Sequence, residues 1–375
     1  MLKFKILEKI ADEQWDEQLL NSDYSTFYQS TKFLETNDSR FPIFVYILDE
    51  KNNVKGQLTL SILKKQSALS SKKLVSYMQK VSSLGNRGTW VSGPIIYSKS
   101  EEERVHILEK FFEAINEIIE KYQLILIDGY SPPQDMQINK EYINLFKKNN
   151  FKIEKFVTFV FDMQKSLDEI WYGIQKYMRV GVKRSEKRGI HVEILKTKQQ
   201  LEEYFKLETK WSKTKGISDE LDLSTIDIQW NKINNGFEKI FLAYENHELI
   251  SALKIMHFNK IVLPIKVLSS YSKATSLGGP ILTWTAIKWT KENKMRLYDL
   301  TGGEAPPKMS EDFSNYEKKW GGIMKYKRKW GGEEFSYYHF VKVKSGYKYK
   351  LMRLLMKPDS IIKNYKKSRV KIPKK

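Results

Sequence analysis

Three basic residues in the middle of the chain have the spacing of an anion-binding surface. Arg179, Lys183 and Arg184 lie in a segment, residues 164–188, whose pattern predicts a helix. Residues 179 and 183 are one helical turn apart and share a face, which suits the binding of a phosphate or carboxylate. Two interpretations are open: a substrate-binding site where two halves of the chain join, or an exposed basic helix end that contributes little.

The second chemical candidate is the sequence around Asp299. This residue ends a predicted buried strand and precedes Gly302 and Gly303. Its carboxylate would orient a substrate amine or cap the next turn, and capping is the commoner role of Asp before Gly. The glycines would let backbone N–H groups approach a substrate or would simply form a tight turn. Tyr271 and Tyr298 are candidate substrate contacts, with a core position as the alternative.

The third candidate is a basic run, residues 325–329, that contains Tyr326 and Lys327. From the residues alone, a solvated surface lysine is the preferred interpretation.

Composition excludes other chemistries. The chain has no Cys, which excludes disulfides, thiolate catalysis and thiolate zinc sites. The five His residues follow neither an HxH nor an HExxH pattern, so we expect no metal site. They are His106, His191, His247, His257 and His339.

The elements that must position these residues occur twice. LILIDGYSPP at residues 124–133 resembles RLYDLTGGEAPP at residues 296–307, and a helical pattern precedes each. Phe146-Lys147-Lys148 is echoed 180 residues later by Tyr326-Lys327-Arg328, and an aromatic-rich strand follows each. A spaced set of matches indicates a duplication better than any single match does. Two related halves usually enclose a cleft between them, where a ligand binds.

Local patterns within each half predict an α+β fold. Residues 41–48 and 56–63 form a predicted hairpin around a polar turn, and residues 240–244 and 249–258 repeat it. A helix is predicted over residues 101–122, with Ser100 as its N-cap. The predicted helix over residues 282–293 is its counterpart in the second half. This order of elements differs from the βαβ alternation of a doubly wound sheet.

Length and charge bound the architecture and the partners. A chain of 375 residues predicts two domains: residues 1–158, with residues 341–375 packing back on them, and residues 159–340. The absence of a long apolar run or signal peptide predicts a cytoplasmic protein, which we expect to be monomeric. The formal net charge is +20. RNA, phospholipid head groups and pyrophosphate-linked precursors are therefore candidate partners, unless the surface lysines have no specific role.

Four segments together resemble one family. TSLGGPILTWTAIKWTKENKMRLYDLTGG and GGIMKYKRKWGGEEFSYYHF resemble the "(Y)D-x-GG" and "FK-x-x-FG" segments of the Fem family of non-ribosomal peptidyltransferases (FemABX). KYMRVGVKRSEKRGIHV at residues 176–192 is similar to the family's basic helix and strand. YSTFYQSTKFL at residues 24–34 is similar to its N-terminal element. The segments occur in the family's order and extend over most of the chain.

The resemblance implies two tandem GNAT-like domains with a cleft between them. It also implies transfer of an amino acid from aminoacyl-tRNA, used as co-substrate without a cofactor, to an amine of a cell-wall peptide precursor. Lys327 then matches the lysine that the family places beside the reacting carbonyl, and Tyr326 the residue before it. Lys183 replaces the second Arg of the family helix, which keeps the charge but loses the bidentate fork. No long charged heptad region lies between Trp211 and Phe237, so we expect no coiled-coil arm.

Two other functional classes remain open. An acyl-CoA-dependent N-acyltransferase acting on a cell-surface glycan or lipid precursor would normally need a Q/R-x-x-G-x-G/A turn at a helix N-terminus. Residues 179–182 lack that spacing. A catalytically silent RNA-binding or membrane-surface protein is supported by charge alone. The basic stretch at residues 347–375 would contact an anionic membrane at its inner face, where a lipid-linked precursor is found, or would dock as a terminal helix.

Overall fold

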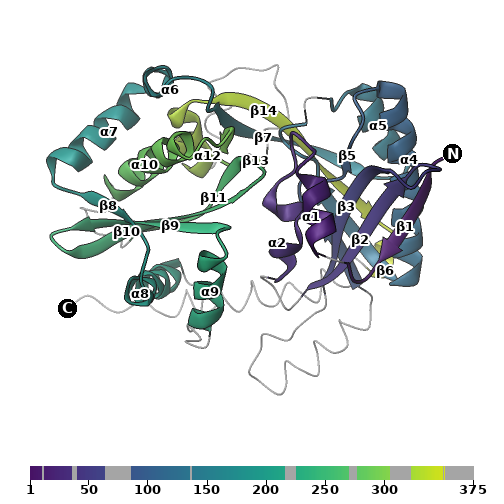
Figure 1. Ribbon diagram of the computed structural model, residues 1–375, viewed down its shortest axis with the longest axis horizontal. Helices are drawn as coiled ribbons and strands as arrows, with labels where there is room; N and C mark the ends of the chain where they lie inside the picture. Colours follow the sequence, from purple (N-terminus) through teal and green to yellow (C-terminus); the bar gives the residue numbers. More distant parts are fainter. Residues whose placement is uncertain are drawn as a thin grey trace. The chain divides into compact units, whose positions relative to one another are not determined.

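The computed structural model describes residues 1–350 except 11, 36–39, 64–85, 136, 216–224, 270–276, 305–321 and 349. Contacts divide the chain into two compact units. Unit 1 contains residues 1–22, residues 28–153 and the described residues from 339 onward. Unit 2 contains residues 23–27 and 154–338. Both units combine helices with a largely antiparallel sheet, so the predicted α+β class is confirmed (Figure 1).

Unit 1 is built on the predicted N-terminal hairpin. Its strand order is β1-β2-β3-β4-β6-β14, with β4 and β6 parallel and the other paired neighbours antiparallel. The bounds of its strands are β1 Lys3–Leu7, β2 Arg40–Leu48, β3 Val54–Leu63, β4 Asn86–Trp90, β5 Ile95–Ile96 and β6 Leu124–Tyr130. Its helices are α1 Asp12–Leu19, α2 Thr31–Glu35, α4 Glu101–Lys121 and α5 Lys140–Lys148, and the 3-10 turn η1 spans Phe27–Gln29.

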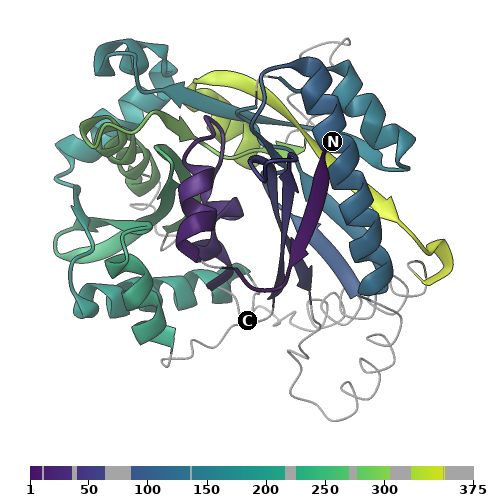
Figure 2. The ribbon, with the colours of Figure 1, turned by 45° about the vertical axis from the view of Figure 1, so that its right-hand side comes forward.

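Period-two alternation in the hairpin separates two packed faces. Phe44 packs against Trp15 of α1, with ring centroids 5.0 Å apart. Gly56 lies opposite Ile47 and faces α4, where a Cβ atom would approach Phe111 to 2.8 Å. The helices α4 and α5 cover that second face, as the blue helices of Figure 2 show. Because successive strand residues point to opposite faces, this hairpin supports both layers.

Unit 2 has a largely antiparallel sheet with helices on both faces, in which β11 and β12 pair in parallel. Its strand order is β7-β12-β11-β10-β9-β8, and β14 is the neighbour of β7. The strands are β7 Lys152–Asp162, β8 His191–Ile194, β9 Glu238–Glu245, β10 Glu248–Phe258, β11 Ile261–Ser269, β12 Leu297–Asp299, β13 Gly303–Glu304 and β14 Glu333–Val343. The helices are α6 Leu167–Gly173, α7 Lys176–Lys187, α8 Lys198–Lys215, α9 Thr225–Asn234, α10 Gly278–Glu292 and α12 Gly322–Trp330.

Two apolar clusters cover the two faces of this sheet. Phe241 of β9 belongs to the cluster beneath α7 and α10, whereas its neighbour Leu242 belongs to the cluster beneath α8 and α9. Figure 1 shows these helix pairs on opposite sides of the strands. A strand covered on both faces is apolar along its length, which explains the sequence KIFLAY in β9.

The last strand of each sequence repeat belongs to the sheet of the other unit. After α5, β7 pairs antiparallel with β12 of unit 2, where Asp299 lies opposite Val160. After α12, residues 339–343 of β14 pair antiparallel with β6 of unit 1, where Phe340 lies opposite Gly129. The unit boundaries, after residues 153 and 338, therefore fall inside strands. The expected boundaries after residues 158 and 340 lie within the same two strands.

Most local predictions are confirmed, with differences at element ends. Both hairpins form, and the Ser100 hydroxyl accepts a hydrogen bond from the Glu103 amide at the start of α4. The helix predicted from residue 282 begins at Gly278, because Pro280 is tolerated in a first turn. The helix predicted over residues 164–188 is two helices, α6 and α7, separated at Ile174 and Gln175.

Two further expectations concern segments outside the sheets. In the described residues between Trp211 and Phe237, the chain forms the end of α8 and the helix α9, without a coiled-coil arm. In the part of the chain that the structure describes, no helix combines the length and apolar character required to cross a membrane. Residues 351–375 and Tyr271 lie outside the described residues.

Replacing Phe340 tests whether the end of β14 stabilises unit 1. Its ring is fully buried and stacks on Phe146 with centroids 3.5 Å apart. We expect Phe340→Ala to lower the free energy of unfolding by about 3–5 kcal/mol, because it leaves a cavity in an aromatic cluster. Urea unfolding measures the loss, and hydrogen exchange of β6 amides assigns it to unit 1. The control is Tyr347→Ala, at an exposed site, with an effect within about 0.5 kcal/mol. Equal effects of the two variants would contradict the prediction.

Candidate functional site

The turn after β12 positions the acidic residue of the predicted site. Asp299 is 1% exposed, and its carboxylate accepts hydrogen bonds from the Thr158 hydroxyl and, at 2.7 Å, from the Thr301 amide. The second bond closes a turn over Leu300, which is the capping arrangement that Asp commonly forms before Gly. Thr301 has a φ of 59°, a left-handed conformation that is uncommon outside Gly, Asn and Asp. The buried carboxylate therefore fixes a turn that is unfavourable by itself.

The two glycines after this turn allow close packing. A Cβ atom on Gly302 would lie 2.4 Å from the Val157 carbonyl oxygen and 2.3 Å from the Tyr337 hydroxyl. A Cβ atom on Gly303 would lie 2.8 Å from the sulfur of Met324 in α12. Glycine is thus required here for the contacts of β13 with its neighbours. This packing accounts for both glycines without a ligand.

Lys327 of α12 is directed toward the same turn. Its Nζ donates hydrogen bonds to the Thr301 carbonyl oxygen at 3.1 Å and to the Thr301 Oγ1 at 2.8 Å. Burial lowers the pKa of the Lys327 ammonium from about 10.5 to about 8, and the nearby Asp299 carboxylate opposes this effect. Asp299, Thr158, Thr301 and Lys327 therefore form one polar cluster, which we call the lysine cluster.

The repeat equivalent of Lys327 has a different environment. Lys147 lies in the last turn of α5 and is exposed to solvent, whereas Lys327 is partly buried. The equivalent of Asp299 also differs. Asp128 lies near the end of β6, and its carboxylate accepts two hydrogen bonds from Arg87, at 3.0 and 2.7 Å. Burial raises the pKa of Asp128, but the interactions with His339 and Arg87 outweigh it and leave the pKa lowered. Unit 1 therefore uses this position for an ion pair and has an exposed lysine where unit 2 has a partly buried one.

Two tyrosines lie beside the lysine cluster. Tyr298 precedes Asp299 and is fully buried, with its hydroxyl unpaired among the described residues. Tyr326 precedes Lys327, and its hydroxyl lies 3.4 Å from the place where a Cβ atom on Gly279 would be. Burial raises the pKa of both phenols, so both are neutral at physiological pH. Tyr326 is thus directed toward the first turn of α10.

The three basic residues of α7 do not share one surface. Met178, Val182 and Ser185 face the core, and Gly181 packs against Pro280 of α10, where a Cβ atom would approach the ring to 3.3 Å. Since each helical residue advances about 100°, Arg179 and Lys183 lie on one side and Arg184 on the other. Lys183 and Arg184 are exposed, whereas Arg179 is partly buried with its guanidinium over the ring of Tyr172.

Sequence reasoning missed the two threonines of the lysine cluster. Thr301 lies within the DLTGG motif, so its place between Asp299 and Gly302 was a usable signal. Thr158 is 141 residues from Asp299, and only the pairing of β7 with β12 brings the two together. No local pattern identifies such a partner.

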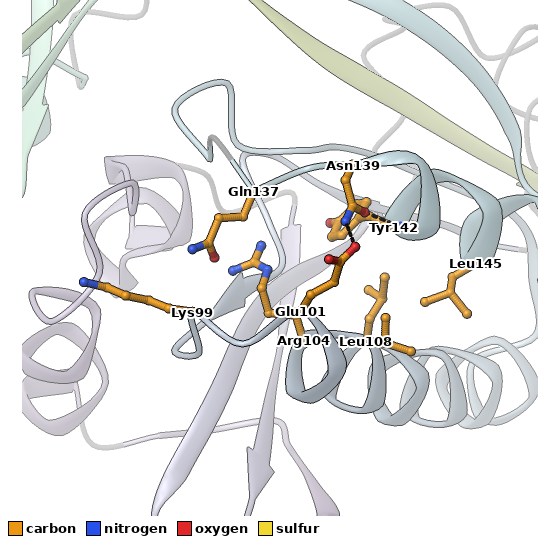
Figure 3. Close-up of a pocket in the computed structure, with 9 residues that line it drawn as sticks. Lys99, Glu101, Arg104, Leu108, Gln137, Asn139, Tyr142 and Leu145 are labelled. Atoms are coloured by element: carbon orange, nitrogen blue, oxygen red, sulfur yellow. Dashed lines mark hydrogen bonds between the residues drawn. The ribbon is translucent and has the colours of Figure 1, made fainter.

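Unit 1 contains a separate cavity of about 230 Å³ between α4 and α5 (Figure 3). Arg104 on its wall forms an ion pair with Asp135 at 2.5 Å, and both side chains are almost fully buried. The same guanidinium donates to the Ser98 carbonyl oxygen at 3.2 Å. None of the predicted site residues lines this cavity. The ion pair joins the start of α4 to the loop after β6, which is a structural role.

Comparison with solved structures identifies the fold. The chain matches FemX with a TM-score of 0.68 over 92% of this chain and 99% of FemX, at 14% sequence identity. L-PGS from Bacillus licheniformis matches with a TM-score of 0.55 over 93% and 98% of the two chains, at 14% identity. A tandem GNAT protein from the clavulanic acid biosynthesis pathway gives 0.52 over 90% and 98%, at 10% identity. No protein-family model and no curated protein matches the chain. The chain has the tandem GNAT-like fold of FemX, as its sequence motifs predicted.

Asp299→Asn tests the electrostatic coupling within the lysine cluster. The amide oxygen of Asn can still accept the bonds of Thr158 and Thr301, but the negative charge that favours protonated Lys327 is lost. We expect the pKa of Lys327 to fall below its present value of about 8, so that its amine reacts faster with an acylating reagent at pH 7. Mass spectrometry of tryptic peptides measures the rates, with the exposed Lys147 as internal control. An unchanged ratio of the Lys327 and Lys147 rates would exclude this coupling.

Proposed function

We propose that the protein is an aminoacyltransferase that moves an amino acid from aminoacyl-tRNA to an amine of a cell-wall peptide precursor. The observation that carries the proposal is the partly buried Lys327, held by Thr301 within a FemX-like fold. The matching "FK" and "(Y)D-x-GG" segments supply both halves of this cluster.

The proposed reaction needs charge stabilisation and no protein nucleophile. The acceptor amine forms a bond to the ester carbonyl carbon, and the bond from that carbon to the ribose oxygen breaks. The amine loses a proton, and the ribose oxygen gains one. Negative charge develops on the carbonyl oxygen in between, where a fixed ammonium is most effective. With a pKa of about 8, the protonated form of Lys327 outnumbers the neutral form by about ten to one at pH 7.

Burial favours Lys327 over its repeat equivalent for this role. A charge in a site that excludes water interacts more strongly with a developing oxyanion than a solvated charge does. Lys147 is exposed and makes no comparable contribution. We therefore assign acyl transfer to unit 2 and treat Lys147 as a matched control.

The donor distinguishes the proposal from its alternative. An acyl-CoA donor would need backbone amides at a helix N-terminus to hold its pyrophosphate. Residues 179–182, the nearest sequence match, lie inside α7 and pack Gly181 against α10. They are therefore unsuitable for this purpose. The net charge of +20 favours a polyanionic donor such as tRNA.

Reconstitution with competing substrates tests the proposal directly. The protein is incubated with a charged-tRNA pool or acetyl-CoA, and with peptidoglycan peptide precursors or vesicles of phosphatidylglycerol. The lipid arm is included because one similar structure is described as a putative lysylphosphatidylglycerol synthetase. Mass spectrometry should detect an added amino acid on the peptide. Detection of modified lipid would show that the acceptor is a lipid and not the proposed peptide. Detection of an acetylated product without an aminoacylated one would show that the donor is acetyl-CoA and not aminoacyl-tRNA.

Lys327→Ala should lower the transfer rate by about 100-fold to 1,000-fold, the usual cost of losing one oxyanion-stabilising group. Lys327→Arg should recover little, because a planar guanidinium does not occupy the position of a compact ammonium. Lys147→Ala should behave like the wild type. Single-turnover kinetics with purified charged tRNA measures the three rates. Equal losses in both alanine variants, or no loss in either, would remove the assignment of Lys327.

The pH dependence follows from the lowered pKa of Lys327. Transfer requires the protonated ammonium, so the rate at saturating substrate should fall as the pH rises through about 8. Asp299→Asn should move this alkaline limb to lower pH, and Lys147→Ala should leave it in place. A pH-rate profile from pH 6 to 10 measures both, with an acid limb set by the acceptor amine. A rate that still rises at pH 10 would contradict a protonated Lys327.

A further inference from the structure

Two tyrosines near the lysine cluster are unusually exposed. Tyr172 in α6 and Tyr177 in α7 are each 71% exposed, although most large aromatic side chains of unit 2 are buried or half-buried. Isolated exposed apolar residues need no explanation, but two aromatic rings close together in sequence on one helix pair form a distinct surface. The question is which partner this surface fits.

Each ring is in contact with a cation. The Arg179 guanidinium carbon lies 5.6 Å from the centroid of the Tyr172 ring, and the Lys329 Nζ lies 4.8 Å from the centroid of the Tyr177 ring. A cation over an aromatic face limits the motion of both side chains. The buried Nε of Arg179 is without a hydrogen-bond partner among the described residues. Both rings remain widely exposed despite these contacts.

The backbone between the two tyrosines contacts α12, the helix that contains Lys327. The Gln175 amide, between α6 and α7, donates to the Lys329 carbonyl oxygen of α12 at 3.1 Å. A Cβ atom on Gly331, just after α12, would lie 2.7 Å from the Gly173 carbonyl oxygen. A capping box between Ser166 and Glu169 fixes the start of α6. Tyr177 is thereby held beside α12. This helix contains both Lys329 and, two residues earlier, Lys327.

The helix that carries Tyr177 is basic, whereas Asp168 and Glu169 are exposed on α6, one turn before Tyr172. Lys176, Lys183, Arg184 and Lys187 are exposed on α7, and Glu186 is its single acidic residue. Single-stranded nucleic acid combines the two matching features, because its bases stack on aromatic rings and its phosphates attract lysine and arginine. An acidic peptide or a lipid head group would use the cations but would gain little from the two ring faces.

We infer that Tyr172 and Tyr177, with Arg179 and Lys329, form a stacking surface for single-stranded RNA. This inference rests on the proposed function for its choice of ligand, the unpaired 3′ end of the donor tRNA. Stacking there would deliver the terminal nucleotide toward α12, and the basic face of α7 would hold the preceding phosphates. Tyr172 and Tyr177 are positioning residues in this arrangement and take no part in bond formation.

Binding of a short fluorescein-labelled single-stranded RNA to the full-length protein tests the inference by fluorescence anisotropy. Tyr172→Ala and Tyr177→Ala should each weaken binding about 5-fold or more, because each removes a stacking partner. The Phe variants should bind like the wild type, because the ring is retained. Tyr347→Ala is the matched control, since Tyr347 is 78% exposed in unit 1. It should leave binding unchanged.

Salt titration separates stacking from charge. Tyr→Ala variants should keep the salt dependence of the wild type, whereas Lys329→Ala should reduce its slope by about one counterion.

No RNA binding by the wild type, or equal binding by the two alanine variants and the control, would overturn the stacking surface. Aminoacyl transfer that depends on Lys327 while RNA binding ignores both tyrosines would retain the proposed function and reject this inference. RNA binding through the tyrosines without aminoacyl transfer would retain the stacking surface and reject the proposed function.

Discussion

The buried carboxylate of Asp299 is the constraint on which the site depends. A carboxylate that is 1% exposed is costly unless hydrogen bonds satisfy it. Thr158 and the Thr301 amide provide those bonds, and in doing so they hold Thr301 in a left-handed conformation. Thr301 then presents its carbonyl and hydroxyl oxygens to Lys327. The strand β7, the turn after β12 and the helix α12, from three parts of the chain, are thus connected through one acidic group.

The duplicated unit shows how the same position acquires different chemistry. Asp128 and Asp299 both end buried strands of the repeated pattern. In unit 1, Arg87 supplies a bidentate ion pair that neutralises the acid, and Lys147 remains in solvent. In unit 2, the Thr158 hydroxyl and the Thr301 amide donate to the acid, and its charge favours the protonated form of Lys327. The same position therefore acts on an arginine in unit 1 and on Lys327 in unit 2.

Exchange of the last strands joins the two repeats. Thr158 reaches Asp299 because β7, which follows the first repeat, pairs with β12 of the second unit. Phe340 likewise reaches the aromatic cluster of unit 1 because the end of β14 pairs with β6. Each unit thus receives a strand from the other copy's sequence. The lysine cluster is consequently incomplete in the isolated second repeat, which lacks Thr158.

The amino-acid sequence by itself determined the local elements and the residues of the main motifs. Both hairpins, the capped helix α4 and the Asp299 turn depend on neighbours a few residues away, and alternation, capping and turn preferences report such neighbours directly. Lys327 was identified through its motif. Tertiary structure alone decided that Lys327 is partly buried while Lys147 is exposed, that Thr158 completes the cluster, and that Tyr172 and Tyr177 remain in solvent. These features depend on contacts between residues far apart in the chain, and local sequence patterns carry no record of which distant segments become neighbours.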